Sequence, residues 1–200
     1  GIDEDTRQRV GSLCIQAAKE INYRGVGTFE FLYEDGQFYF IEMNTRIQVE
    51  HPVTEIVTGI DLVKEQLKIA AGYKLSYEQS DVRLTGHAIE CRINAEDPFS
   101  FRPSPGKINY YHPASGPGVR VDSHLYGGYS VPPNYDSLVA KLICSGCDRE
   151  EALIRAKNAL SEFVIDGILT NIPLHTELVS DATFLKADHT INYLEKKLKK

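Results

Sequence analysis

The feature that most constrains the fold is the segment 27–44, which reads GTFEFLYEDGQFYFIEMN. Two runs rich in Phe and Tyr stand on either side of Asp35-Gly36, a pair that favours a tight turn between antiparallel strands. Aromatic residues suit strands because they pack well on a pleated surface. We therefore predict a β-hairpin, and its register decides which side chains share a face.

The length of the connecting loop sets that register. A two-residue turn at Asp35-Gly36 places Glu30 opposite Ile41 and turns Glu42 to the other face of the hairpin. A loop of three residues shifts the pairing by one residue and leaves Glu30 and Glu42 on the same face. The two loop lengths therefore differ in whether two carboxylates converge.

The second strand leads into IEMNTRIQVEHP, residues 41–52, where polar and apolar residues alternate. Successive side chains of an extended chain point to opposite faces, and Pro52 is expected to stop the extended run. One face of this run would carry Glu42, Asn44, Arg46, Gln48 and Glu50. From the pattern alone, this face is either an ordinary solvated surface or the wall of a site.

Three side chains with oxygen donors are candidate metal ligands. Mg²⁺ prefers hard oxygen ligands and commonly uses one or two carboxylates together with substrate phosphates. Glu30, Glu42 and Asn44 offer such a set, and the alternative is a solvated hairpin face. Because the two carboxylates stand among aromatic residues in the sequence, they need a partner or stay protonated.

Charged residues farther along the chain are candidates for anion chemistry. The fork of donors on Arg46 fits a planar oxyanion such as carboxylate or bicarbonate, and Glu50 could act as a base near it. A structural pair between Arg46 and Glu50 is the alternative. For Arg92, in IECRIN, the local sequence favours a surface salt bridge with Glu90.

Periodicity and capping signals predict the helices of the first half. Apolar residues recur at helical spacing over residues 3–22, which indicates an amphipathic helix. A second helix is expected over residues 61–71, with Asp61 as its N-cap and Gly72 just past its end. Residues 73–85 are polar and irregular, and we expect the domain boundary there.

The second half has a different pattern. GHAIECRINAED alternates and predicts a strand, FRPSPGKINYYHPASGPG predicts mainly loop with a short strand, and GVRVDSHLYGGYSVPPNYDSLVAKLICSG predicts two strands joined by a long loop. A helix should begin at Asp148, where Glu151 completes a capping box, and should end at Gly167 with Val164 in its apolar stripe. Pro173 suits the first turn of another short helix.

Composition narrows the classes of function. The net charge of −6 gives no reason to expect nucleic acid, and no apolar run reaches membrane-spanning length. Widely spaced cysteines indicate reduced thiols in the cytoplasm; they are Cys14, Cys91, Cys144 and Cys147. The sequence has no G-x-x-x-x-G-K-[ST] phosphate loop, no G-x-G-x-x-G and no H-E-x-x-H. If a nucleotide is used, its phosphate cradle lies outside these residues.

With these residues in view, FIEMNTRIQVEHPVTE resembles the signature of the biotin carboxylases, members of the ATP-grasp superfamily. GTFEFLYEDGQFYF, GHAIECRINAEDP, PSPGKI, YDSLVAKLI and NYLEKKL resemble the same family, in order, across nearly the whole chain. The resemblance implies an α+β fold in two parts. Residues 1–84 would be the C-terminal part of an ATP-grasp core, and residues 85–200 the biotin carboxylase C-terminal domain, with mostly antiparallel sheet and flanking helices.

The resemblance also implies a reaction and roles for residues. In the family, ATP phosphorylates bicarbonate to carboxyphosphate, which then carboxylates N1 of biotin on a carrier protein. The ligands of Mg²⁺ or Mn²⁺ match Glu30, Glu42 and Asn44. The bicarbonate site matches Arg46, Gln48 and the backbone of Val49, with Glu50 as the general base. The arginine beside biotin matches Arg92, and the adenine pocket of ATP matches Leu32 and Ile191.

Further expectations follow from this resemblance. Convergent metal ligands require the three-residue hairpin loop, so we predict it. The family's chains are more than twice as long, so we expect part of a longer protein that is inactive alone. Expected partners are a biotin carboxyl carrier protein or domain, a carboxyltransferase component and a second copy in a homodimer. The motifs look closest to acetyl-CoA carboxylase, but propionyl-CoA and pyruvate carboxylases share much of them. The alternatives are another ATP-grasp carboxylate–amine ligase and a non-catalytic dimerisation or carrier-docking module.

Overall fold

The predicted hairpin forms in the structure, a computed structural model that describes residues 2–198. Strands β1 (Thr28–Glu34) and β2 (Gln37–Asn44) pair antiparallel around a two-residue turn. Asp35 and Gly36 both have positive φ, as a hairpin turn that matches the twist of the strands requires. The prediction of a three-residue loop is therefore wrong.

A β-bulge nevertheless brings the carboxylates together. Near the turn Phe31 lies opposite Phe40, but one step farther Glu30 lies opposite Glu42, so that Ile41 is the extra residue. Cross-strand partners share a face of a hairpin, and a bulge shifts the pairing by one residue. The face predicted for Glu30 and Glu42 is thus correct, although the device that produces it is different.

Aromatic rings occupy the opposite face of the hairpin. The ring centroids of Phe31 and Phe40 are 5.8 Å apart, and those of Tyr33 and Phe38 are 4.8 Å apart. Strict alternation along β2 would place Glu42 on this aromatic face. Because Ile41 is inserted, Glu42 leaves the aromatic face and joins the polar one.

Outside the hairpin, the regular elements described in the first unit, Gly1–Arg83, are helices joined by turns and loops. Its helices are α1 (Glu4–Glu20), α2 (His51–Thr58), α3 (Leu62–Ala70) and the 3₁₀ turn η1 (Gln79–Asp81). Asp3 and Asp61 cap α1 and α3 by accepting a backbone N–H at 2.8 Å, which confirms both predicted helices. The predicted extended run up to Pro52 is wrong, because β2 ends at Asn44 and Pro52 lies in the first turn of α2.

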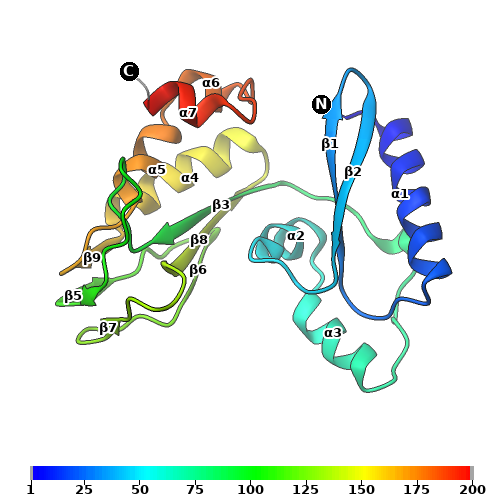
Figure 1. Ribbon diagram of the computed structural model, residues 1–200, viewed down its shortest axis with the longest axis horizontal. Helices are drawn as coiled ribbons and strands as arrows, with labels where there is room; N and C mark the ends of the chain where they lie inside the picture. Colours follow the sequence, from blue (N-terminus) through cyan, green and yellow to red (C-terminus); the bar gives the residue numbers. More distant parts are fainter. Residues whose placement is uncertain (1, 199–200) are drawn as a thin grey trace. The chain divides into compact units, whose positions relative to one another are not determined.

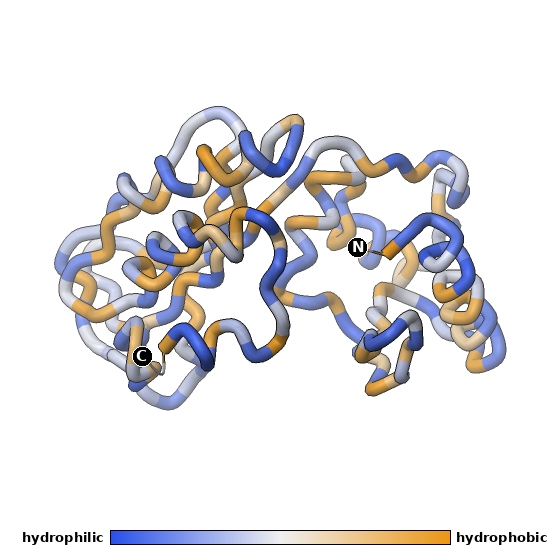
Figure 2. Tube along the Cα trace, turned by 90° about the horizontal axis from the view of Figure 1, so that it is seen from above, coloured by the Kyte–Doolittle hydropathy of each residue, from blue (hydrophilic) through white to orange (hydrophobic). Residues whose placement is uncertain are grey.

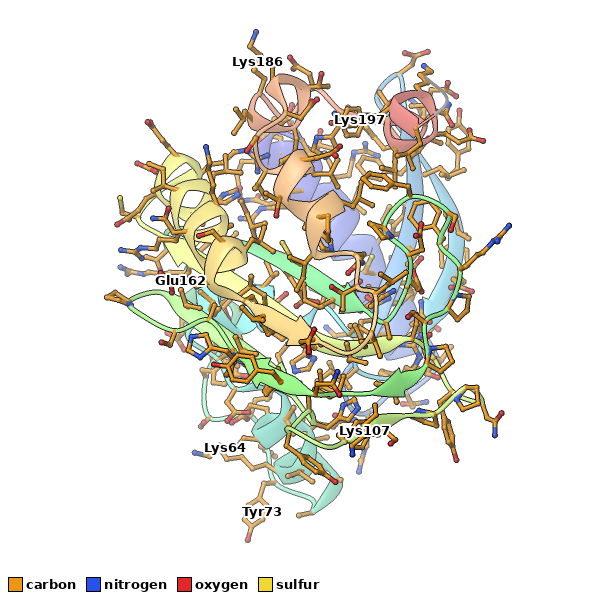
Figure 3. The ribbon with its side chains drawn as sticks, turned by 90° about the vertical axis from the view of Figure 1, so that its left-hand side faces the viewer. Lys64, Tyr73, Lys107, Glu162, Lys186 and Lys197 are labelled. Carbon is orange, nitrogen blue, oxygen red and sulfur yellow. The ribbon has the colours of Figure 1, made fainter. Side chains whose placement is uncertain are left out.

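The first unit buries little apolar surface. No residue of α1 is buried, although hydrophobic and hydrophilic segments alternate along this helix (Figure 2). At least half of the surface of several apolar hairpin side chains is exposed; they are Leu32, Tyr33, Tyr39, Phe40 and Ile41. Tyr73, after α3, also projects away from the ribbon (Figure 3).

The second unit, Leu84–Lys200, contains the remaining sheets and helices (Figure 1). Its strands are β3 (His87–Asn94), β4 (Gly106–Lys107), β5 (Tyr110–His112), β6 (Val119–Ser123), β7 (Ser130–Val131), β8 (Leu138–Gly146) and β9 (Val164–Asp166). Its helices are α4 (Arg149–Glu162), α5 (Ile172–Leu178), α6 (Ala182–Leu185) and α7 (Tyr193–Leu198). Every strand pair of the described residues is antiparallel, which confirms the predicted α+β class.

The core of this unit lies between one sheet and one helix. The sheet has the order β3-β8-β6, so that β8 is central, and α4 packs across it. Ile93, Leu142 and Ala156, from β3, β8 and α4, are completely buried. Among the described residues, every member of the hydrophobic core cluster belongs to this unit. In the first unit, Pro52 of α2 is a fully buried apolar side chain outside that cluster.

At the start of α4 the predicted N-cap bond forms, but the return bond of the capping box goes to Cys147 instead of Asp148. The end of the helix also differs from the prediction. The Asp148 side chain accepts the backbone N–H of Glu151 at 2.8 Å, and Glu151 accepts the N–H of Cys147. The helix ends at Glu162, with Phe163 as its C-cap, rather than at Gly167, and Val164 begins β9. Residues 164–166 pair with β5 instead of continuing the helix, because their backbone N–H and C=O groups find partners on β5.

None of the described helices is long and apolar enough to cross a membrane.

We predict that Leu142→Ala destabilises the protein strongly. Leu142 is completely buried, and removal of such a side chain costs about 2–5 kcal/mol because a cavity remains. The matched control is Leu169→Ala, since 54% of the Leu169 surface is exposed and surface changes stay within about 0.5 kcal/mol. Urea unfolding measures both; similar losses for the two variants would contradict the assigned core.

Candidate functional site

The polar face of the hairpin gathers two carboxylates around one amide. The Asn44 Nδ2 atom donates to Glu30 Oε1 at 2.7 Å and to Glu42 Oε1 at 3.2 Å. Glu30 lies on β1 and the other two residues lie on β2. The structure thus brings the three predicted metal-ligand candidates into direct contact, and the bulge at Ile41 is what makes this contact possible.

A fourth side chain joins this cluster from outside the hairpin. Gln48 Nε2 donates to Glu30 Oε1 at 2.8 Å. Gln48 does not reach Glu30 by strand alternation, because residues 45–50 form no strand. Instead the chain turns after β2 and folds back, so that the Glu30 carboxylate receives two amide N–H donors.

The segment 45–50 also carries the two predicted anion-site residues. Arg46 is exposed, and its Nη1 donates to the carbonyl of Ile47 at 3.1 Å. Val49 lies in a turn, and the exposed Glu50 takes the N-cap position of α2. The backbone carbonyl of Glu50 accepts the N–H of Val53 at 3.1 Å. The first turn of α2 therefore fixes the backbone position from which the Glu50 side chain extends.

The cluster has the donor set of a hard divalent cation. Two carboxylates face each other, and amide N–H groups lie where a cation would relieve their repulsion. Rotation of the Asn44 amide by half a turn exchanges its N and O atoms and presents Oδ1 as a ligand. In residues 2–198 no three His, Cys, Asp or Glu side chains gather around a possible metal, so a cation here needs further oxygens, as substrate phosphates provide.

The other predicted site residues are divided between the two units. Leu32 lies on β1, two residues from Glu30 and on the same face, and 52% of its surface is exposed. Arg92 lies in β3 of the second unit, on an exposed face between the buried Cys91 and Ile93. Ile191, just before α7, is 89% exposed. The metal-ligand candidates and Gln48 therefore form one cluster, and Arg92 and Ile191 belong to the other unit.

Two residues in contact with Arg92 were missed by the sequence analysis. Asn171 Nδ2 donates to the Arg92 carbonyl at 3.0 Å, and His175 Nε2 lies 2.8 Å from the same oxygen. Desolvation lowers the pKa of His175, although its bond to the Arg92 carbonyl opposes this. The sequence separation is 79 and 83 residues, and no local pattern reports such a contact.

The cysteines have the character of structural thiols. Burial raises the pKa of Cys91 to about 12 and that of Cys144 to about 11. Both lie in the sheet core, and none of the four cysteines forms a disulfide. Thiols with raised pKa values are poor nucleophiles at neutral pH, so the candidate chemistry rests with the carboxylates and arginines.

Two family models match the chain. The model described as "Biotin carboxylase C-terminal domain" matches residues 90–196. The model described as "Carbamoyl-phosphate synthase L chain, ATP binding domain" matches residues 1–78.

Individual relatives agree with these models. A biotin carboxylase of Pseudomonas aeruginosa is 66% identical over 198 residues, which is 99% of this chain and 44% of that protein. A pyruvate carboxylase subunit of Methanothermobacter thermautotrophicus is 53% identical over 188 residues, 93% of this chain and 38% of that protein. This chain therefore spans less than half the length of the relatives it matches.

A solved structure agrees as well. The biotin carboxylase domain dimer of Hydrogenobacter thermophilus 2-oxoglutarate carboxylase, in complex with MgADP, ADP and bicarbonate, matches with a TM-score of 0.95. The identity is 49%, over 98% of this chain and 44% of that chain.

We predict that Asn44→Asp makes stability depend on Mg²⁺. The change removes two N–H donors and adds a third carboxylate beside Glu30 and Glu42, which should cost about 1–3 kcal/mol without metal. Thermal unfolding should show that millimolar Mg²⁺ raises the melting temperature of this variant more than that of the wild type.

The matched control is Asn158→Asp, which makes the same charge change on an exposed position of α4. Equal Mg²⁺ responses in the two variants would rule out a cation site at the hairpin.

Proposed function

We propose that this chain, which belongs to the biotin carboxylase family, supplies the metal, bicarbonate and biotin contacts of an enzyme that carboxylates biotin. The reaction uses Mg-ATP and bicarbonate, and the biotin is attached to a carrier protein. The observation that carries this proposal is the contact of Asn44 with both Glu30 and Glu42. On an ordinary solvated hairpin face, nothing would favour two carboxylates in contact with the same amide.

We assign Glu30, Glu42 and Asn44 to the cation. Their oxygens would hold Mg²⁺ or Mn²⁺ together with phosphate oxygens of ATP, and the cation would neutralise charge on the phosphates during transfer. Gln48 holds Glu30 through a hydrogen bond of 2.8 Å and so fixes the direction of that carboxylate. Leu32, on the same face, is assigned with Ile191 to the adenine pocket of ATP.

We assign Arg46, Gln48 and the Val49 backbone to bicarbonate, and Glu50 to its deprotonation. A guanidinium binds a planar oxyanion through two parallel N–H donors. Val49 and Glu50 follow Gln48 directly and lie in the turn before α2. Three consecutive residues can therefore contribute to one site, which suits an anion as small as bicarbonate. Deprotonated bicarbonate attacks the γ-phosphate of ATP, ADP leaves and carboxyphosphate forms; preorganised charges favour this step.

We assign Arg92 to biotin. The family resemblance gives it the role of stabilising the enolate of biotin. N1 of that enolate then takes up the carboxyl group of carboxyphosphate, whose bond to phosphate breaks so that inorganic phosphate leaves. Arg92 lies on an exposed strand face, and its neighbours on both sides are buried. The buried neighbours fix the backbone, and the guanidinium stays accessible. A fixed positive charge favours an anion formed during reaction.

The first unit is proposed to be part of an ATP-grasp domain, residues 1–84, and the second to be the C-terminal domain, residues 85–200. All hydrophobic core residues that are buried in the described chain belong to the second unit. The exposed apolar side chains of α1 and the hairpin fit a domain that needs further polypeptide to complete its core. This chain covers 44% of the Pseudomonas aeruginosa relative, so that protein has further polypeptide, which we propose packs on these side chains.

The proposed partners are a biotin carboxyl carrier, a carboxyltransferase component and a second copy of the protein. The related 2-oxoglutarate carboxylase domain is described as a dimer, which supports the last of these. A cytoplasmic location fits the free thiols of the described residues. The motifs favour acetyl-CoA as the final acceptor. Because the relatives include a subunit of pyruvate carboxylase, pyruvate is the alternative acceptor.

A second candidate is another ATP-grasp ligase that joins a carboxylate to an amine. The match of residues 1–78 to the ATP-binding domain of carbamoyl-phosphate synthase favours it, because that match does not involve Arg92. ADP release by the complete protein separates the two. Biotin carboxylation requires bicarbonate and is accelerated by free biotin, whereas another ligase would release ADP with a different carboxylate.

We predict that Arg46→Ala in the complete protein lowers bicarbonate-dependent ADP release by at least about tenfold, or about 1.4 kcal/mol. The guanidinium would no longer hold bicarbonate, so the loss should appear mainly as a raised KM for bicarbonate. Arg24→Ala is the control, because Arg24 is an exposed arginine of the same unit outside the hairpin. A smaller loss at Arg46 than this threshold would remove it from the bicarbonate site.

We also predict that the isolated 200-residue chain does not hydrolyse ATP, even with bicarbonate and biotin. It has no glycine-rich phosphate loop in its sequence. Coupled ADP assays measure this, with the complete protein as positive control; ATP turnover by the isolated chain would contradict the proposed division of the site.

A further inference from the structure

The edge of β3 that carries Arg92 is covered by side chains rather than by another strand. In the sheet order β3-β8-β6, β3 is an edge strand. Backbone groups on such an edge must find partners elsewhere. At Arg92 and Asn94 these partners come from Asn171 and His175, at the start of α5 and inside it.

Asn171 supplies the hydrogen bonds that a neighbouring strand would give to this edge. Its Nδ2 donates to the Arg92 carbonyl at 3.0 Å, and its Oδ1 accepts the Asn94 N–H at 2.8 Å. Its own N–H donates to the Asn94 carbonyl at 3.2 Å. Asn171 is buried, so these three bonds are not exchanged for bonds to water without cost.

The place of Asn171 in its helix makes this use of the side chain notable. It is the N-cap residue of α5, where an asparagine side chain normally accepts an N–H from the first helical turn. In this structure the Asn171 side chain makes no such capping bond. Its hydrogen bonds go to the strand instead, so the residue serves the placement of β3 rather than the start of α5.

His175 gives the same carbonyl a second donor. Its Nε2 lies 2.8 Å from the Arg92 oxygen, one helical turn after Asn171. The ring is half-buried, and desolvation lowers its pKa, so the neutral tautomer with hydrogen on Nε2 fits this contact. One carbonyl thus receives two donors from one short helix.

We propose that Asn171 and His175 are positioning residues for biotin, which hold the Arg92 backbone so that its guanidinium meets the bound biotin. This inference rests on the proposed function, because it takes Arg92 as the biotin-side arginine. Misplacement of a reacting group by about 1 Å can cost about a hundredfold in rate. Because Asn171 and His175 both bond to the Arg92 carbonyl, the backbone that carries the Arg92 guanidinium moves less.

The decisive experiment uses His175 variants of the complete protein, with free biotin, Mg-ATP and bicarbonate. His175→Leu removes the donor, and His175→Gln replaces Nε2 by an amide N–H of similar reach. Thr176→Val is the control, because the Thr176 hydroxyl donates to the Ile172 carbonyl within α5 and not to β3. ADP release is measured with and without biotin.

The expected result is a split between the two activities. His175→Leu should lower kcat/KM for biotin by about tenfold while ADP release with bicarbonate alone stays within about twofold of the wild type. His175→Gln should restore most of the loss, and Thr176→Val should resemble the wild type. If both activities fall together, or neither falls, the positioning role is wrong and the contact only stabilises the fold.

A second variant keeps the inference separable from the proposed function. Asn171→Ala should increase amide hydrogen exchange at residues 92–94 relative to the centre of β8, because it frees the edge bonds. Absence of bicarbonate-dependent ADP release in the wild type would reject the proposed function, whatever the exchange shows. Unchanged exchange at residues 92–94 in Asn171→Ala would reject the clamp on β3 by itself.

Discussion

The candidate site depends on two like charges that a hairpin forces to face each other. Glu30 and Glu42 are cross-strand partners, an arrangement that is unfavourable unless something lies between them. In the structure, the Asn44 amide lies between them and Gln48 supports Glu30. This repulsion is the physical reason for the proposal that a divalent cation binds between the two carboxylates.

The bulge at Ile41 shows how a small backbone feature decides the chemistry of a face. With the two-residue turn and no bulge, Glu42 would join the aromatic face formed with Phe31 and Phe40. A carboxylate among those rings would lose hydration without gaining a partner. The inserted residue separates the two surfaces, so that the rings pack on one side and the oxygens converge on the other.

How far the sequence predicts this structure depends on how local each interaction is. The caps at Asp61 and Asp148 were predicted correctly, because a cap bonds to an N–H only three residues away. The bulge was not, because turn propensity and strand alternation each fitted a regular ladder. The convergence of Glu30 and Glu42 was expected only through the family resemblance. Helix α2 was missed, since alternation in residues 45–50 indicated a strand.

The second unit shows why long-range contacts matter most for the site and are hardest to predict. Leu142 and Ile93 are buried by elements whose apolar patterns are visible in the sequence. Asn171, in contrast, has an ordinary capping position, and only the fold reveals that its side chain turns to β3. Periodicity reports which residues fill a core. It does not report which polar group completes the edge of a strand 79 residues away. An edge strand that carries an accessible arginine needs a polar partner for its backbone. Without one, the edge would be mobile and the guanidinium would occupy many positions. Its interaction with any one ligand would then be weaker.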